Sequence, residues 1–265
     1  MQAFVCDFDH TLVGRDALLR PRTRAAIARS QAAGIPVIVA TGRMFRSVRP
    51  YLEQVDLKEP VVCYQGAAVV DPASSTFLLH EPIALETARE AISLMIELGH
   101  PPNCYVDDQL FVGQHTEYSR MYADFQHLPV EEVGDLLAWL DRPPTKLVAV
   151  ADPPDIPALR AAVEEALGER LFLTTSLAHM LEVGNPTVSK GTGLTFVAAR
   201  LGISLEHVVS FGDGENDLEL IDAAGFGIAV DDANPLLLER ADWICASAEV
   251  EGVATVIDAY LESIA

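Results

Sequence analysis

The chain has 265 residues, half of them apolar, which is enough for one large domain or two smaller ones with a buried core. Its formal net charge of −21 argues against a nucleic-acid partner or an anionic membrane surface, since both call for a basic patch. No apolar run approaches the roughly 18–20 residues that span a bilayer, and no signal peptide or CxxC pair is evident, so we expect a cytoplasmic protein with reduced thiols.

The first third alternates short apolar runs with a helical pattern, which is typical of an α/β fold with a mostly parallel sheet. The helix is expected to begin at Pro21 and to end before Gly34, where each residue type is favoured. The predicted elements of this third are strands at 4–9, 35–42, 61–64 and 67–71 and a helix at 21–33.

The middle third changes to strands with few helices. Its predicted elements are helices at 84–99 and 156–167, a hairpin at 103–113 that turns at Asp107-Asp108, and strands at 145–152, 171–176 and 179–184. We therefore expect an α+β domain over residues 82–185, inserted between two parts of a core formed by 1–81 and 186–265.

From Lys190 the alternation of strand and helix resumes, with a helix over 190–201 and a strand over 207–211. Further strands are predicted at 225–230 and 241–246, separated and followed by helices. If the strands near 4–8, 36–40 and 207–211 share one sheet, the first and last thirds form a single domain.

Polar side chains follow three of the predicted core strands at their carboxyl ends, where open parallel sheets bind ligands. These residues are Asp7, Asp9, Thr41, Gly42, Arg43, Asp213, Asn216 and Asp217. Asp7 and Asp9 are two apart, so on an extended strand their carboxylates point the same way. Two such charges about 4 Å apart repel by roughly 4 kcal/mol at an effective dielectric near 20. Either some carboxyls hold protons, or a hard cation lies among them.

An all-oxygen set of ligands suits Mg²⁺, which takes a few carboxylates together with a substrate phosphate. The hydroxyl of Thr41, the N–H groups around Gly42, and Lys190 at a helix start would supply donors and positive charge to that phosphate. A cation, donors and a lysine around a carboxylate predict phosphoryl transfer from a small phosphorylated substrate to an aspartate nucleophile.

Four segments, DFDHT, ATGR, SKGTGL and GDGEND in this order, resemble the motifs of the haloacid dehalogenase-like superfamily. The insert between ATGR and SKGTGL resembles the Cof-type branch of phosphatases, whose α/β (C2-type) cap occupies that position. The resemblance covers essentially the whole chain. It implies a Rossmann-like core with a mostly parallel sheet, an inserted α+β cap, and a Mg²⁺-dependent phosphatase.

The resemblance also implies a role for each matching residue. Asp7 would be the nucleophile that forms an aspartyl phosphate. Asp9 would act as general acid and then as base, with its backbone carbonyl on the metal. Asp213 would ligate Mg²⁺ directly, and Asp217 would bind through metal waters or orient Lys190. The residues implied on the phosphate side are Thr41, Gly42, Arg43, Lys190 and Asn216.

Two positions depart from the family pattern. His10 stands where the family usually has glycine, and Gln65 stands near the cap junction where asparagine is common. Both are expected to alter the entrance to the site without touching its chemistry.

Substrate choice is expected to lie in the insert, with His179, Glu182 and Asn185 as candidate contacts. Prolines at Glu81-Pro82 and Asn185-Pro186 restrict the two crossings, which suits a hinge. Two other functions stay open: a phosphomutase or phosphotransferase of the same chemistry, and a non-catalytic module that binds a phosphorylated ligand. A monomer and a weak dimer are both compatible with the sequence.

Overall fold

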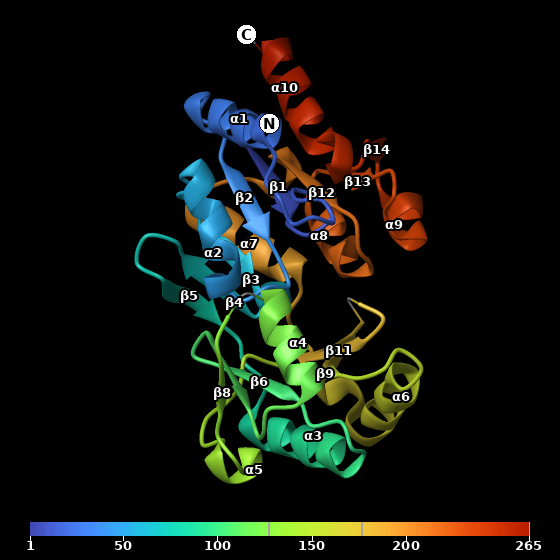
Figure 1. The fold of residues 1–265 in the computed structure, drawn as a ribbon. Coiled ribbons are helices and arrows are strands. Elements are labelled where there is room, and N and C mark those ends of the chain that lie inside the picture. Colours follow the sequence, from blue (N-terminus) through green and yellow to red (C-terminus); the bar gives the residue numbers. More distant parts are fainter. Residues whose placement is uncertain (127, 176, 265) are drawn as a thin grey trace. The chain divides into compact units, whose positions relative to one another are not determined.

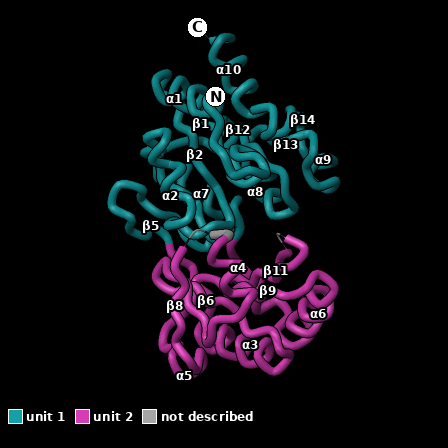
Figure 2. Tube along the Cα trace, in the orientation of Figure 1, with its two compact units in different colours: residues 1–79, 189–265 teal, residues 80–188 magenta. Residues whose placement is uncertain are grey.

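Residues 1–126, 128–175 and 177–264 are described by a computed structural model, drawn in Figure 1. The chain divides into two units, residues 1–79 with 189–265 and residues 80–188, which Figure 2 shows in different colours. The expected crossings at Pro82 and Pro186 fall inside the second unit, a few residues from its ends.

The first unit is built on an eight-stranded sheet in the order β14-β13-β12-β1-β2-β3-β4-β5, parallel from β14 to β3. Its strands are β1 (Ala3–Asp7), β2 (Val37–Ala40), β3 (Val61–Cys63), β4 (Ala68–Asp71), β5 (Thr76–His80), β12 (Val208–Gly212), β13 (Phe226–Val230) and β14 (Trp243–Cys245). Strands β12, β1 and β2 are neighbours, so the prediction that the first and last thirds share a sheet is confirmed.

Helices accompany this sheet because its central strands are buried on both faces. The helices are α1 (Pro21–Ala32), α2 (Phe45–Leu52), α7 (Lys190–Leu201), α8 (Leu218–Ala223), α9 (Pro235–Arg240) and α10 (Gly252–Ile264). Leu194 and Val197 of α7 and Leu220 of α8 pack against Val5 and Ile38 of the sheet in one apolar cluster. This packing fixes where α7 begins, which matters for the site.

The chain turns sharply where β1 ends, at Asp7 and not at residue 9. Asp9 lies beyond the strand and forms an isolated bridge with Val13, and His10 between them has a φ of +61°. A positive φ favours glycine, which accounts for the glycine usual at this position in the family. Asp7 and Asp9 are thus not alternate residues of one strand, and the expectation that their carboxylates point the same way is wrong.

The second unit is built on a six-stranded sheet in the order β10-β11-β9-β6-β7-β8. Its strands are β6 (Asn103–Val106), β7 (Gln109–Val112), β8 (Val130–Glu132), β9 (Lys146–Val150), β10 (Phe172–Thr174) and β11 (Met180–Gly184). Asp107 and Asp108 both have a positive φ in the tight turn between β6 and β7, so the predicted hairpin is confirmed.

The helices of the second unit are α3 (Leu85–Glu97), α4 (Glu117–Gln126), α5 (Leu136–Trp139) and α6 (Ile156–Leu167). Residues of α3, α5 and α6 pack with one face of the sheet in a single apolar cluster. Short 3₁₀ turns occur at Glu53–Val55, Tyr64–Gly66, Gly168–Arg170, Leu205–His207, Glu215–Asp217 and Ala248–Val250. None of the helices in the described ranges is both long and apolar enough to cross a membrane.

Candidate active site

The candidate site lies at the carboxyl ends of three neighbouring parallel strands of the first unit. Asp7 ends β1, Thr41 directly follows β2, and Asp213 directly follows β12. Because parallel strands end at the same edge of a sheet, residues far apart in the sequence meet there. The sheet order therefore places side chains from three of the four motifs at one edge.

Lys190, from the remaining motif, joins this edge as the first residue of α7. The helix begins there because Ser189 accepts a hydrogen bond from the Thr192 N–H in a capping box. The turn after β3 comes close enough to touch the helix start: Gly66 has a φ of +99°, and a Cβ on it would lie 1.9 Å from the Ser189 carbonyl oxygen. Glycine is needed at that position both for its conformation and for its lack of a side chain.

The Lys190 side chain is 1 % exposed, and its ammonium group lies between two carboxylates. Its Nζ donates to Asp7 Oδ1 at 2.5 Å and to Asp217 Oδ1 at 2.6 Å. The other oxygen of Asp217 accepts the backbone N–H groups of Asp213 and Gly214, each at 3.0 Å. Both oxygens of Asp217 are therefore engaged, and this residue holds Lys190 against Asp7.

The ionisable groups at this edge strongly alter one another's pKa values. Burial raises the pKa of the Asp7 carboxyl well above its ordinary value, against the opposing effect of Lys190. Burial and then the charge of Asp217 raise the pKa of Asp213 to about 6. Burial alone would lower the pKa of Lys190, but the charges of Asp217 and Asp7 outweigh it and raise that pKa. The positive charge of Lys190 alone thus does not bring the pKa values of Asp7 and Asp213 back to their ordinary range.

The same carboxylates fit a divalent cation. One oxygen each from Asp7, Asp213 and Asp217 lies within 4.8 Å of the others. A cation among them would offset the burial and mutual repulsion that raise the pKa values of Asp7 and Asp213. Their ligand atoms are all oxygens, the type that Mg²⁺ prefers. The residues present therefore suit the expected metal.

Asp9 is held away from this cluster by Arg43. The guanidinium donates twice, from Nε to Asp9 Oδ2 at 2.8 Å and from Nη2 to Asp9 Oδ1 at 2.6 Å. Arg43 is itself buried and lies over the rings of Phe8 and Tyr51, at 5.2 and 5.8 Å from their centroids. Arg43 was expected on the phosphate; the structure places it on Asp9, which it orients in a two-point contact.

The groups expected to bind phosphate have definite neighbours. Thr41 Oγ1 accepts the backbone N–H of Arg43 at 3.1 Å, which leaves the hydroxyl hydrogen to donate elsewhere. Asn216 Nδ2 donates to Gln65 Oε1 at 3.0 Å. A Cβ on Gly42 would lie 2.4 Å from Gln65 Nε2, so Gly42 leaves room for that amide.

Three residues contribute more than the sequence indicated. Gln65 holds Asn216, and His10 lies near enough for its charge to oppose the rise in the pKa of Asp213. The expectation that these two departures leave the chemistry untouched stays a prediction. Thr11 donates to Asp213 Oδ1 at 3.4 Å, although no role was assigned to it. Thr11 is the last residue of the DFDHT motif, and that position is the feature of the sequence that indicates a place near the site.

In the second unit, two of the three candidate substrate contacts have internal partners. Glu182 pairs with Lys146 at 2.6 Å, and both side chains are less than a tenth exposed. Asn185 Nδ2 donates to the Pro82 carbonyl at 3.1 Å, which ties the two crossings of the chain to each other. His179 is half-buried just before β11. Glu182 and Asn185 thus have structural roles within this unit.

Replacing Glu182 by Ala is expected to lower the free energy of unfolding by about 3–5 kcal/mol, because it leaves the Lys146 ammonium buried without that carboxylate. Urea denaturation of the full chain measures the effect. The double variant Lys146→Met with Glu182→Leu removes both charges and should recover most of the loss. A single variant as stable as the unaltered protein would show that the pair is not a buried ion pair.

A sequence model of haloacid dehalogenase-like hydrolases matches residues 4–257. The 5-amino-6-(5-phospho-D-ribitylamino)uracil phosphatase YitU of Bacillus subtilis is 27 % identical over 96 % of this chain and 95 % of its own length. The pyridoxal phosphate phosphatase YbhA of Escherichia coli is 28 % identical, covering 96 % and 97 %. A haloacid dehalogenase-like hydrolase from Bacteroides thetaiotaomicron superposes with a TM-score of 0.89 over 98 % of this chain and 99 % of that one, at 22 % identity, and so shares the fold.

Proposed function

Because the chain belongs to the haloacid dehalogenase-like hydrolase family and is a phosphatase of that family, we propose that it hydrolyses a small phosphorylated metabolite through an aspartyl phosphate on Asp7. The observation that carries this proposal is the buried Asp7–Lys190–Asp217 triplet at the edge where three strands end. If Lys190 had only a structural role, one carboxylate partner would suffice. Here it contacts two, and the carboxylate of Asp213 lies beside them.

In the proposed first step, a carboxylate oxygen of Asp7 attacks phosphorus and the bond from phosphorus to the ester oxygen breaks. The departing oxygen takes a proton from Asp9, which must be protonated and released from at least one of its two Arg43 hydrogen bonds to donate it. In the second step, water gives a proton to Asp9 and attacks phosphorus, the bond to Asp7 breaks, and inorganic phosphate leaves. After the second step Asp7 is again a free carboxylate and Asp9 again holds its proton, so the cycle is closed.

Other residues would hold the phosphoryl group during both steps. Lys190 supplies a fixed positive charge, and the Thr41 hydroxyl, the amides near Gly42 and Asn216 supply hydrogen-bond donors. Mg²⁺, when bound by Asp7, Asp213, the Asp9 carbonyl and Asp217 directly or through water, would supply the positive charge that attracts phosphoryl oxygens and keeps these carboxyls ionised.

The test of this function is a screen of phosphorylated metabolites in which released inorganic phosphate is measured. Phosphate release that needs no sugar or alcohol acceptor supports a hydrolase. Phosphoryl transfer to an added acceptor without phosphate release would favour the mutase or phosphotransferase. Binding without any turnover of p-nitrophenyl phosphate would favour the non-catalytic module.

Arg43→Lys is expected to lower kcat by about 10–100-fold with little change in KM, because a lysine cannot make the two-point contact that orients Asp9. Steady-state hydrolysis of p-nitrophenyl phosphate gives both constants. Arg49→Lys on α2, the helix that follows Arg43 in the chain, is the matched control: its side chain is exposed and pairs with Glu53, and both constants should stay unchanged. A rise in KM at constant kcat would instead place Arg43 on the phosphate.

We also propose that the insert selects the substrate. His179→Ala is expected to raise KM for the physiological ester several-fold and to leave p-nitrophenyl phosphate hydrolysis nearly unchanged, because a small generic ester draws little binding energy from the insert. His179 is preferred to Glu182 and Asn185 for this test, since their substitution also removes internal contacts. Equal losses on both esters would contradict the proposal.

A further inference from the structure

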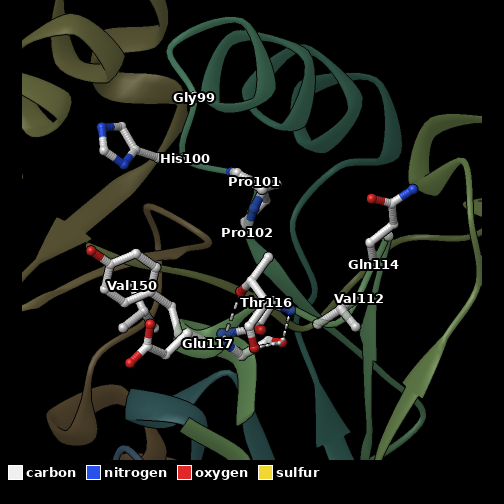
Figure 3. Close-up of a pocket in the computed structure, with 13 residues that line it drawn as sticks. Gly99, His100, Pro101, Pro102, Val112, Gln114, Thr116, Glu117 and Val150 are labelled. Carbon is white, nitrogen blue, oxygen red and sulfur yellow. Dashed lines mark hydrogen bonds between the residues drawn. The ribbon is translucent and has the colours of Figure 1, made fainter. Parts of the chain in front are cut away.

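The second unit contains a cavity that has no part in the proposed reaction (Figure 3). It measures about 350 Å³, within the range of small-molecule sites but at its lower end. The residues that line it come from the loop before β6, the end of β7 with the segment after it, the first turn of α4, and the end of β9. Its walls are largely apolar, formed by Pro101, Pro102, Val112 and Val150.

Two buried polar side chains line this cavity: Ser119 in the first turn of α4, and Asn103, the first residue of β6, which is only 3 % exposed. Its neighbour Cys104 packs into the apolar cluster with α3 and α6. Because side chains alternate along a strand, Asn103 faces the opposite side, where Tyr105 reaches Tyr122 of α4. Within the described part of the chain, no hydrogen bond involves the Asn103 amide, although Asn103 lines the cavity.

An amide in this position calls for a partner. Because the Asn103 amide has no hydrogen bond within the described residues and is not fully buried, it is open to the cavity, where water or a ligand can complete it. The Asn103 side chain offers both an acceptor oxygen and donor hydrogens. A group that presents a donor beside an acceptor, as another amide does, can satisfy both at once.

The first turn of α4 adds donors to the same cavity. Thr116 and Ser119 cap the helix reciprocally, with the Thr116 N–H on Ser119 Oγ at 2.8 Å and the Ser119 N–H on Thr116 Oγ1 at 3.0 Å (dashed in Figure 3). The N–H groups of Glu117 and Tyr118, also in this turn, have no acceptor within the helix. They favour a ligand that carries an acceptor oxygen.

The surrounding charges argue against an ionic ligand. Glu117 lines the cavity, and the Asp152 carboxylate accepts a hydrogen bond from the Tyr118 hydroxyl and raises its pKa. These two carboxylates disfavour an anion at the helix start. The partial positive charge of the helix N-terminus disfavours a cation. His100 also lines the cavity, so the charged and titratable groups around it are of mixed sign, and with the apolar walls they favour an uncharged ligand with a hydrophobic body.

We propose that this cavity is a second binding site, for a small uncharged ring compound that carries a carboxamide or lactam group. The amide of the ligand pairs with Asn103, its carbonyl oxygen is within the field of the α4 N-terminus, and its ring lies between the proline and valine walls. The proposal does not depend on the reaction at Asp7, because every lining residue belongs to the second unit.

Nicotinamide is the probe, and nicotinate is its matched control, since it has the same ring with a carboxylate in place of the amide. Both are titrated into the ¹⁵N-labelled full chain and followed by NMR. Nicotinamide should shift the resonances of Asn103, Gly113 and Glu117 in a saturable way, and nicotinate should bind at least ten-fold more weakly. Equal binding of the two, or shifts confined to Asp7 and its neighbours, would overturn the proposal.

Asn103→Ala should weaken nicotinamide binding at least ten-fold, while Gln109→Ala, which removes an amide from the same sheet outside the cavity, should leave it unchanged. Both variants should keep the circular dichroism spectrum and the rate of p-nitrophenyl phosphate hydrolysis. If Asn103→Ala does not fold, Val150→Phe fills the cavity from its apolar wall and should abolish binding. Unaltered binding in the folded variant, or a cavity that holds only water, contradicts the site.

Discussion

Replacing Asp7 by Asn is expected to reduce turnover by about 10⁴-fold or more, because an amide is a poor nucleophile and no other group takes its place. The fold should survive, since Asn has nearly the shape of Asp and Lys190 keeps the carboxylate of Asp217. Hydrolysis of p-nitrophenyl phosphate measures the loss, and circular dichroism with the melting temperature checks the fold.

Asp56→Asn is the matched control for this variant. Asp56 is exposed, pairs with Lys58 at the surface, and has a left-handed backbone conformation that Asn also adopts readily. Its substitution should leave turnover unchanged. Retention of more than a few per cent of activity by the Asp7 variant would show that phosphate does not pass through this carboxylate.

Removal of Mg²⁺ by EDTA is expected to abolish turnover and to lower the melting temperature, and the effect on stability should depend on pH. Without metal, the raised pKa values of Asp7 and Asp213 mean that the folded state holds these protons more tightly than the unfolded state. Their contribution to stability is therefore complete below about pH 4; that of Asp213 is lost as pH rises through about 6, and that of Asp7 as pH rises through its own raised pKa. Mg²⁺ should offset that loss, so it should raise the melting temperature more at pH 7.5 than at pH 5.

Scanning calorimetry or dye-monitored melting, with and without Mg²⁺ across this pH range, tests the dependence. Asp213→Asn should remove most of the stabilisation by Mg²⁺, because it deletes the carboxylate whose pKa lies in the range. Ca²⁺ should also stabilise the fold, but turnover with Ca²⁺ should be lower than with Mg²⁺, because Ca²⁺ takes more ligands at longer distances. Undiminished activity in chelator, or equal stabilisation at both pH values, would contradict a metal among these carboxylates.

The position of the site could be predicted because the sheet determines it. Buried parallel strands appear in the sequence as continuous apolar runs, and each of the three relevant runs ends in a polar residue, namely Asp7, Thr41 and Asp213. The order of the strands then brings these residues to one edge. Lys190 could be placed as well, since Ser189 and Thr192 mark a helix start in the sequence.

The pairing of Asp9 with Arg43 could not be predicted, because it depends on the chain leaving the strand at Asp7 and turning through His10. Histidine is not a residue that signals a left-handed conformation as strongly as glycine does. The contact between Gln65 and Asn216 likewise joins two loops whose shapes are determined only in the folded molecule. In both cases the unpredicted residue, Arg43 or Gln65, contacts a residue of the candidate site and not the phosphoryl group itself.

Helix α4 was missed for a related reason. Its sequence mixes aromatic and charged residues, and part of its support is tertiary: Tyr122 contacts Tyr105 of the sheet through both ring and hydroxyl. The buried pair of Glu182 with Lys146 could not be predicted either, because charged residues of these types are usually exposed. Buried polar contacts of this kind are visible only once the elements are packed.

The central claim, covalent catalysis by Asp7, is tested most directly by trapping the intermediate. The enzyme is mixed with substrate and Mg²⁺ and quenched in acid within one turnover, and its peptides are then analysed by mass spectrometry. The peptide containing Asp7 should carry one phosphoryl group that hydroxylamine removes, at a level that rises and decays as fast as phosphate is released. Phosphate release with no phosphoryl group on that peptide at any time point would contradict the mechanism.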